Sequence, residues 1–520
     1  MKYLNQKFSA GLLSCVVLTL MLPLASCDKG FEEMNKNPNA YTEPVIGNLF
    51  TFSIIRTAGT GTEDRNRVLI KHISGLMQYM ASLQTFWYGE KYLYHDQGGN
   101  YFETAYEFHL KELQQIFPFV EDDPEQVNHL AMARIWRVYI MHRVTDIYGD
   151  TPYSEAAKGF TQGVFKPKYD PQSEIYADML RELEEAAAQL DPEKSSFGAA
   201  DIIYGGDALK WRKFAYSMML RLGMRLTEVD EAMAQEWVQK AIAGGVMESN
   251  EDISLIEHVD GHVNTRNQDA WELQRESFPP SAQGLAKVKL SRTMIDMLQN
   301  RNDPRLPFYA HLYNGINSPE LQKGLPNGQD DATISNVIPG WANDRLREYS
   351  EPNNKTIANM NSPSVFLSYT EVEFLLAEAT IRGWKGGSAE EHYHAAIRAS
   401  MEATTLYPGE VVIGPAFIED YLVAQPLTGT TEEQMEKIHV QMYLSHFMWL
   451  DFLEAWSNWR RTGYPELIPV NYPGNDTGGV IPRRLRYPQS EAALNTESYE
   501  AALSRQGPDL MLTRVWWDAE

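Results

Sequence analysis

The segment 127–245 contains four stretches of one-sided hydrophobicity, and these constrain the fold more than any other feature of the chain. The second stretch is the clearest, because its apolar residues recur every three or four positions, as on one stripe of an α-helix: Ile175, Met179, Leu183, Ala187 and Leu190. Each stretch begins at a helix-start signal, namely Asp123-Pro124, Asp170-Pro171, Asp207 and Asp230. We therefore predict four amphipathic helices, with a loop at 148–153 after the first and a stop at Gly244-Gly245.

One-sided helices that follow each other along a chain bury their stripes against one another. Antiparallel pairs stacked as in tetratricopeptide repeats are the simplest arrangement of this kind. Helix pairing resumes at 370–382 and 388–401, and a capping signal at Thr431 opens a helix that can extend to Trp459. We predict an all-α fold of tetratricopeptide-like helix pairs, in a single domain over 45–520. Long loops are expected to be inserted around 250–290, 314–361 and 460–488.

The first 44 residues have the pattern of an export signal followed by a tether. Lys2 and Lys7 precede a largely apolar run over 12–24, which ends at Leu24-Ala25-Ser26-Cys27. This ending matches the bacterial lipobox, in which the cysteine is lipidated and becomes the new N-terminus. The alternative is an ordinary cleaved signal peptide, but such a signal does not require a cysteine at the cleavage site. We predict a lipoprotein signal over 1–26, lipidation of Cys27 with anchoring to a membrane, and a flexible tether over 27–44.

Charge and cysteine content exclude some functions. The chain carries 46 Lys and Arg against 70 Asp and Glu, a net charge of −24. Nucleic-acid binding requires clustered cations that neutralise phosphates, and no basic run of that kind is present, so nucleic acid is excluded as a partner. Both cysteines, Cys15 and Cys27, belong to the N-terminal segment, which excludes thiol catalysis and a disulfide framework downstream.

The window 86–102 is unusual because seven of its 17 residues are aromatic. Aromatic rings in a loop usually fill the core beneath it, but Tyr and Trp also stack on sugar rings and ligand side chains, and we weigh the two roles equally. The ligand-binding candidates are Trp87, Tyr88, Tyr92, Tyr94, Asp96 and Asn100. Trp341, in the polar loop 314–361, is a further candidate, although a Trp in such a loop more often anchors the loop itself.

The sequence contains no recognisable catalytic or metal-binding signature. It lacks a nucleophile elbow, a P-loop, a dinucleotide fingerprint and a Cys/His cluster, so we expect no catalytic residue, no metal site and no cofactor. His392 and His394 are two positions apart on a predicted helix and point in different directions, so they cannot share a metal. Asp146 and Asp150 form the best carboxylate pair for a glycosidase, but a turn built from Asp, Gly and Pro explains them better.

Several motifs, in order along the chain, resemble the SusD/RagB family of Bacteroidetes outer-membrane lipoproteins, in particular its SusD-like branch. After the lipobox come residues 31–39, then residues 145–156, and then Tyr204-Gly205-Gly206-Asp207 leading to Trp211-Arg212-Lys213-Phe214. The C-terminal motifs are Glu454-Ala455-Trp456, the run 459–465 (Trp-Arg-Arg-Thr-Gly-Tyr-Pro) and the run 481–488 (Ile-Pro-Arg-Arg-Leu-Arg-Tyr-Pro). Each motif is weak alone, but the ordered set covers essentially the whole mature chain.

The resemblance implies tetratricopeptide-like helix pairs whose inserted loops form the ligand face. It also implies a surface-exposed outer-membrane lipoprotein that captures a glycan, or sometimes a peptide, and delivers it to a partner SusC-like TonB-dependent transporter. The shared motifs are implied to be scaffold, so Asp150, Arg460 and Arg461 are expected to form caps and salt bridges and not ligand contacts.

We therefore expect a non-catalytic glycan-binding protein whose ligand stacks on Trp87 and its neighbours. On this hypothesis the Trp87→Ala variant loses about 1–3 kcal/mol of ligand binding while its melting temperature stays nearly unchanged. The alternatives are a peptide-binding member of the same family, a surface glycoside hydrolase, and a purely structural partner of a transporter.

Overall fold

The computed structural model describes residues 45–60, 67–277, 286–409 and 411–519, and the structural statements below concern these residues. Cys27, the predicted signal over 1–26 and the predicted tether over 27–44 lie outside them. Residues Ile46–Glu520 form one compact unit.

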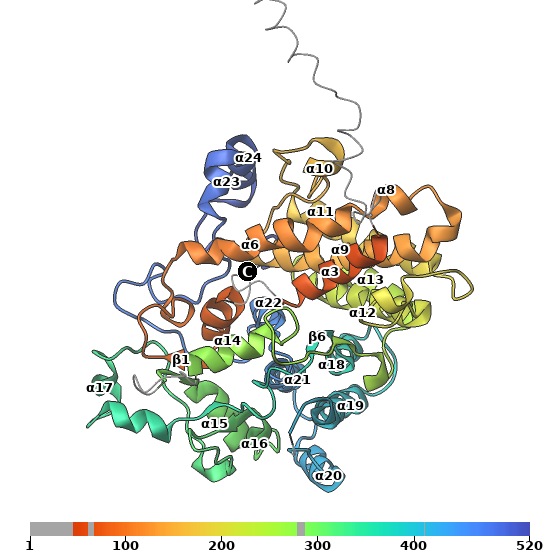
Figure 1. The fold of residues 1–520 in the computed structure, drawn as a ribbon. Coiled ribbons are helices and arrows are strands. Elements are labelled where there is room, and N and C mark those ends of the chain that lie inside the picture. Colours follow the sequence, from red (N-terminus) through yellow and green to blue (C-terminus); the bar gives the residue numbers. More distant parts are fainter. Residues whose placement is uncertain (1–44, 61–66, 278–285, 410, 520) are drawn as a thin grey trace, which may run out of the picture. The chain divides into compact units, whose positions relative to one another are not determined.

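The four helices predicted between 127 and 245 are present and pack in sequence, each against the next. They are α9 (Val127–Tyr148), α11 (Gln172–Gln189), α12 (Ala208–Arg225) and α13 (Glu231–Gly244). Figure 1 shows them as the orange to yellow layer. Asp207 and Asp230 cap α12 and α13 as predicted: an Asp207 carboxylate oxygen accepts from the backbone N–H of Leu209 at 2.9 Å, and one of Asp230 accepts from that of Met233 at 3.0 Å.

The start of α11 differs from the prediction. Asp170 does not cap this helix, because its carboxylate accepts instead from the backbone N–H groups of Tyr153 and Ser154, at 3.1 and 2.7 Å. Asp150 takes that place, accepting from the N–H of Gln172 at 2.9 Å. The turn before Asp150 requires glycine: Gly149 has φ of +86°, and an added Cβ would lie 2.2 Å from the side-chain oxygen of Gln506.

A second group of helices packs on the first through α12 and α18. Its members are α18 (Tyr369–Ile381), α19 (Ala389–Glu402), α20 (Pro415–Ala424), α21 (Thr431–His446) and α22 (Phe452–Thr462). The prediction of one helix from Thr431 to Trp459 is wrong. The chain turns at Leu450, which has φ of +52°, and Asp451 then caps α22 by accepting from the N–H of Glu454 at 3.3 Å. The capping box of α21 consists of Thr430 and Glu433.

Short elements precede α9. The segment from Val45 contains α3 (Ile46–Thr57), the π-helical turn η2 (Val68–Ile73), α5 (Ser74–Leu76) and the strand β1 (Met80–Ser82). The aromatic window follows, with the turns η3 (Gly89–Lys91) and η4 (Asp96–Gly99). The next segment is broken into α6 (Asn100–Thr104), η5 (Ala105–Leu110), α7 (Lys111–Gln114), α8 (Phe117–Val120) and η6 (Pro124–Gln126).

The inserted segments contain short strands that fasten them to the helical scaffold. Three antiparallel pairs form: β1 with β3 (Val288–Leu290), β2 (Ser254–Ile256) with β6 (Ser364–Leu367), and β4 (Ala310–His311) with β5 (Glu351–Pro352). In the first pair Met80 lies opposite Leu290. The helices and turns of these segments are η8 (Asn250–Asp252), α14 (Gln268–Ser277), α15 (Arg292–Asn300), α16 (Leu306–Tyr309), η9 (Pro319–Leu321), α17 (Ile334–Val337) and η10 (Asn343–Glu348).

The remaining elements are short: α10 (Gly159–Gln162), η7 (Gly198–Ala200), η11 (Ala403–Leu406), α23 (Gln489–Leu494) and α24 (Thr496–Gln506). Buried apolar side chains form two large clusters, one among the helix pairs and one beneath the inserted segments. A third, small cluster includes Ala81, Leu325, Ile334 and Tyr349. Helices predominate and strands occur only as short pairs, so the predicted all-α, tetratricopeptide-like fold is confirmed for the described part of the chain.

Of the three motif residues expected to form caps and salt bridges, Asp150 and Arg461 do so, whereas Arg460 instead packs on aromatic rings and donates to the carbonyl of Arg483 at 2.9 Å. Asp150 accepts from the Nε of Arg505 at 2.9 Å in addition to its contact with Gln172. The guanidinium of Arg460 lies 3.9 Å from the centre of the Trp456 ring. Arg461 forms a two-pronged ion pair with buried Glu378, with both nitrogen–oxygen distances at 2.7 Å.

Candidate functional site

Two inserted segments, 314–361 and 460–488, meet at a cavity of about 300 Å³ beside α15, which we call the Gln78 cavity. Its lining combines amide, hydroxyl and guanidinium groups with small apolar side chains: Gln78, Arg292, Thr293, Pro326, Asn327, Gly328, Gln329, Val337, Ile468, Pro469, Val470 and Asn471. Concave sites with a few convergent polar groups on an apolar wall are typical of small-ligand binding.

Gln78 holds two walls of this cavity together. Its side-chain nitrogen donates to the carbonyl oxygen of Ile468 at 2.5 Å, and its side-chain oxygen accepts from the Thr293 hydroxyl at 2.6 Å. The backbone of Gln78 has φ of +54°, a conformation that residues other than glycine rarely adopt. Strained positions of this kind often occur at binding sites.

The floor of the cavity rests on a buried ion pair from the aromatic window. The Glu90 carboxylate accepts from the side-chain nitrogen of Asn327 at 3.1 Å and from the N–H of Gly328 at 3.2 Å. Lys91 donates to the same carboxylate at 2.6 Å and to the carbonyl of Ser82 at 2.8 Å. Burial raises the pKa of Glu90, and the ammonium of Lys91 opposes that rise. The window therefore supports the cavity from beneath.

Trp87 and Tyr92 belong to the core, which corrects their prediction as ligand platforms. Trp87 is 0% exposed and Tyr92 is 1% exposed. The loop is pressed onto η2, because a Cβ added at Gly89 would lie 1.8 Å from the carbonyl oxygen of His72. The Tyr92 hydroxyl accepts from the N–H of Val470 at 3.2 Å, and burial raises the pKa of Tyr92 to about 12. Tyr92 thus stabilises the cavity wall from behind and presents no ring face to a ligand.

The other candidates in the window lie nearer the surface and are spread apart. Tyr88 is half-buried and stacks on His95, with ring centres 4.1 Å apart. The guanidinium of Arg486 lies over the Tyr94 ring, 4.1 Å from the ring centre. Tyr94 and Asp476 also line a separate cavity of about 120 Å³. Asp96 is exposed and accepts from the side-chain nitrogen of Gln489 at 2.7 Å, whereas Asn100 is half-buried at the start of α6.

Trp341 is half-buried and belongs to the same inserted segment as the Gln78 cavity. Its ring centre lies 5.8 Å from that of Tyr349, and its indole N–H donates to the side-chain oxygen of Asn343 at 3.3 Å. It packs on the small cluster that contains Ile334 and Ile338. Ile338 directly follows Val337, which lines the cavity. Trp341 therefore anchors its loop, as the commoner role predicted, and stays partly exposed.

Comparison with known proteins identifies the family. The sequence model of the SusD-like family, described as starch-binding and associating with the outer membrane, matches residues 38–488. The chain belongs to this SusD-like family. No curated protein matches the chain.

Solved structures agree with this assignment. A chitin-binding protein is 32% identical, with a TM-score of 0.79, and the match covers 91% of this chain and 100% of that one. A chitin-binding SusD homolog from Flavobacterium johnsoniae is 26% identical, with a TM-score of 0.74 and coverage of 91% and 99%. A SusD homolog from Bacteroides uniformis is 25% identical, with a TM-score of 0.75 and coverage of 92% and 100%. Members of this family are binding proteins, and this SusD-like chain is a binding protein and not an enzyme.

The chemistry of the Gln78 cavity agrees with binding. None of the described residues that line it is an Asp, Glu, His, Lys, Tyr or Cys, so the lining has none of the side chains that usually act as a general acid or base. Asp146 and Asp150, the best carboxylate pair for a glycosidase in the sequence, both have structural partners away from this cavity. Asp146 is buried and accepts from the indole N–H of Trp517 at 2.9 Å, and Asp150 caps α11. Burial raises the pKa of both carboxyls, but neither lines the cavity.

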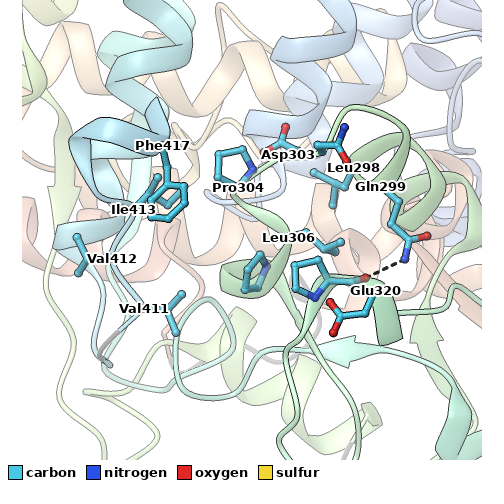
Figure 2. A pocket seen from close by; sticks show the side chains of 13 residues that line it. Leu298, Gln299, Asp303, Pro304, Leu306, Glu320, Val411, Val412, Ile413 and Phe417 are labelled. Atoms are coloured by element: carbon cyan, nitrogen blue, oxygen red, sulfur yellow. Dashed lines mark hydrogen bonds between the residues drawn. The ribbon is translucent and has the colours of Figure 1, made fainter. Parts of the chain in front are cut away.

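A larger cavity, of about 640 Å³, lies between α15, α16 and the segment that leads into α20. Figure 2 shows its mainly apolar lining, with Val411, Val412, Ile413 and Phe417 on one side and Leu298, Leu306 and Glu320 on the other. Its main polar groups hold the wall together. Gln299 donates to the carbonyls of Pro319 and Gln322, both at 2.9 Å, and Asp303 pairs with Arg305 at 2.6 Å. The lining of this cavity is therefore mainly apolar.

The polar residues of the Gln78 cavity were not among the sequence predictions. Gln78, Arg292, Asn327 and Asn471 come from four distant segments and carry no shared motif. The available signal was the length and Gly/Pro/Asn content of the segments 314–361 and 460–488, which indicated inserted functional loops without naming residues.

No metal-binding group of three or more His, Cys, Asp or Glu side chains is found in the described ranges. His392 bonds to the Glu373 carboxylate at 2.6 Å, whereas His394 contacts the carbonyl of Gln425 at 2.9 Å, so the two histidines have separate partners. Within the same ranges, none of the helices combines the length and apolar character needed to cross a membrane.

Proposed function

We propose that this SusD-like protein binds a glycan at the Gln78 cavity and delivers it to a SusC-like TonB-dependent transporter. The observation that carries the proposal is the lining of the cavity, where amide and guanidinium groups stand beside Pro, Val and Ile side chains with no acid or base among them. Sugars present hydroxyls that bond to such polar groups and C–H faces that pack on such apolar ones. The family description and the chitin-binding relatives support a glycan over other neutral ligands.

Among the aromatic candidates, Trp341 fits best as a ring that stacks on the bound sugar. It is half-exposed and packs on the apolar cluster that contains Ile338, the residue after Val337. Tyr88, Tyr94, Asp96 and Asn100 remain candidates for further contacts with a longer ligand, since all four keep some surface exposure. Stacking of this kind adds hydrophobic contact without requiring a charged ligand.

Replacing Arg292 by Ala is expected to weaken glycan binding by about 1–3 kcal/mol without changing the melting temperature. The side chain is exposed, and its guanidinium makes no hydrogen bond or close ion pair with another described residue, so its loss removes a donor from the cavity and only a longer-range interaction with Asp296 on α15. Isothermal titration calorimetry with chitin oligosaccharides and with malto-oligosaccharides measures the change and identifies the better ligand. Arg181→Ala, at an exposed position on α11, is the matched control. Equal affinity of parent and Arg292→Ala for every sugar that binds would count against the cavity, and binding of peptides alone would favour the peptide alternative.

The proposal also includes lipidation of Cys27 and display on the outer membrane, in line with the family description. The Cys27→Ala variant is expected to move from the membrane fraction to the soluble fraction, because anchoring by acyl chains depends on the thiol. Cell fractionation followed by mass spectrometry of the mature N-terminus measures both effects. Delivery to a transporter further predicts that the lipidated protein copurifies with a TonB-dependent barrel in mild detergent. An unmodified cysteine in membrane-extracted protein would refute the anchor.

A further inference from the structure

The loop 151–170 carries two phenylalanines that the fold leaves in water. Phe160 and Phe165 are each 82% exposed. Single exposed apolar side chains are common, but two large exposed aromatic rings on one loop indicate a surface that contacts another molecule. Figure 1 shows the turn α10, which carries Phe160, standing beyond α11 at the top of the view.

Hydrogen bonds hold this loop in one conformation, so the exposure of the rings follows from the fold. Its neck is closed by a backbone bridge between Thr151 and Asp170, and the N–H of Asp170 donates to the carbonyl of Thr151 at 3.0 Å. Farther out, the N–H of Lys168 donates to the Glu155 carboxylate at 2.9 Å. The side-chain nitrogen of Asn495 also donates to the carbonyl of Pro167 at 2.9 Å, which ties the loop to α24.

The tip of the loop brings Phe165 beside Gly159, the residue before Phe160. The N–H of Gly163 donates to the carbonyl of Gly159 at 3.1 Å, and Gly163 has φ of +71°, so the chain reverses between the two phenylalanines. The Phe165 ring lies against Gly159, because a Cβ added at Gly159 would be 3.4 Å from a ring carbon of Phe165. Phe165 is therefore next to the residue that precedes Phe160, and we call the segment that carries these two exposed rings the Phe160/Phe165 tip.

The charge of the tip is opposite to that of the chain. Between Ala156 and Tyr169 there are three lysines, Lys158, Lys166 and Lys168, and no acidic residue, although the whole chain has a net charge of −24. Lys168 is 3.1 Å from the Asp170 carboxylate, whereas Lys158 and Lys166 form no ion pair with any residue that the structure describes. Aromatic rings flanked by lysines are the usual composition of segments that insert into the headgroup region of an anionic membrane.

We propose that the Phe160/Phe165 tip is a membrane-contact element that inserts both rings into an anionic lipid surface, with Lys158 and Lys166 facing the lipid phosphates. The charge complementarity and the preformed tip carry this assignment. The family description, which places such proteins at the outer membrane, agrees with it. The contact would add a second attachment to the proposed acyl anchor and would limit how the protein rotates on the membrane. It does not depend on which ligand the Gln78 cavity takes.

Vesicle cosedimentation tests the proposal with residues 27–520 carrying Cys27→Ser, so that no acyl chain contributes. This chain includes the whole compact unit Ile46–Glu520. Vesicles of phosphatidylethanolamine with phosphatidylglycerol are compared with vesicles of phosphatidylcholine alone. The parent is expected to bind the anionic vesicles more tightly, and the double variant Phe160→Ser/Phe165→Ser is expected to bind them about tenfold more weakly. Lys158→Ala/Lys166→Ala is expected to lose the preference for anionic vesicles.

Phe417→Ser is the matched control, because Phe417 on α20 is also an exposed phenylalanine, at 68%, and should not affect vesicle binding. All of the replaced side chains lie at the surface, so melting temperatures should stay equal. A parent that ignores anionic vesicles, or a Phe160→Ser/Phe165→Ser variant that binds like the parent, overturns the proposal. So does an equal loss in Phe417→Ser. Loss of copurification with a transporter barrel in the absence of any vesicle binding would assign the tip to a protein partner and would refute the lipid contact.

Discussion

The Glu378→Gln variant is expected to unfold with a free energy about 3–5 kcal/mol lower than that of the parent. Glu378 on α18 is 0% exposed and receives both guanidinium prongs of Arg461 at 2.7 Å and the Nε of Arg382 at 2.9 Å. His439 on α21 lies 3.3 Å away. Glutamine keeps the shape of the side chain but removes its charge, so cationic groups from α18 and α22 are left buried without a counter-charge. Urea unfolding followed by circular dichroism measures the loss.

The pKa of Glu378 predicts how the stability difference between the parent and the Glu378→Gln variant depends on pH. Burial alone raises the pKa of Glu378, but Arg461 and His439 outweigh it and hold the pKa well below the usual 4.5. Because the folded state favours the ionised form, this contribution to stability is complete above about pH 4.5 and is lost as the pH falls toward the lowered pKa. The stability difference between parent and Glu378→Gln should therefore stay constant near neutral pH and shrink progressively in acid.

Glu348→Gln is the control, because it removes a carboxylate with similar partners from the surface. Glu348 contacts Arg345 at 3.1 Å and Lys323 at 3.0 Å, and these contacts also lower its pKa, but its side chain is 45% exposed. Solvent screens such pairs, so the expected loss is less than about 1 kcal/mol. Equal losses in the two variants would show that the Glu378 cluster does not link the helices as we infer.

The helical scaffold could be predicted because its signals are local. Apolar spacing and the caps at Asp207 and Asp230 are read within one turn of helix, and they place α12 and α13 correctly. The predictions failed where two local signals compete. Apolar spacing continues from Thr431 to Trp459, but Asp451 caps a new helix after Leu450 adopts a left-handed conformation. Asp170 lost the cap of α11 to Asp150, because the closed loop 151–170 requires its carboxylate for the N–H groups of Tyr153 and Ser154.

The proposed binding site could be predicted only as a region. The resemblance implied that the inserted segments 250–290, 314–361 and 460–488 form the ligand face, and two of them, 314–361 and 460–488, border the Gln78 cavity. The identity of the lining depends on long-range contacts, such as the bond from Gln78 to the carbonyl of Ile468, 390 positions along the chain. The aromatic window was recognised as unusual for its composition, but composition cannot tell which rings point inward. The contact of Gly89 with the backbone of His72 decides this, because it presses the window onto the core.

The Trp87→Ala variant gives the sharpest test of that burial, since it is expected to lose about 3–5 kcal/mol of stability. Trp87 is 0% exposed and belongs to the apolar cluster beneath the inserted segments, so truncation leaves a cavity in packed surroundings. The sequence alone predicted the opposite outcome, a weaker ligand affinity with a nearly unchanged melting temperature. Thermal unfolding of the variant, measured beside urea unfolding, decides between the two.

Trp341→Ala separates stability from binding, because this ring is half-exposed and packs only at the edge of the small cluster around Ile334. We expect it to cost less stability than Trp87→Ala and, on the proposed function, to weaken glycan binding more than it lowers the melting temperature. Any affinity lost in Trp87→Ala should instead follow the fraction of protein that is unfolded, and it should return when stability is restored at lower temperature. A Trp87→Ala protein that is fully folded and yet unable to bind would mean that this ring turns outward to meet the ligand.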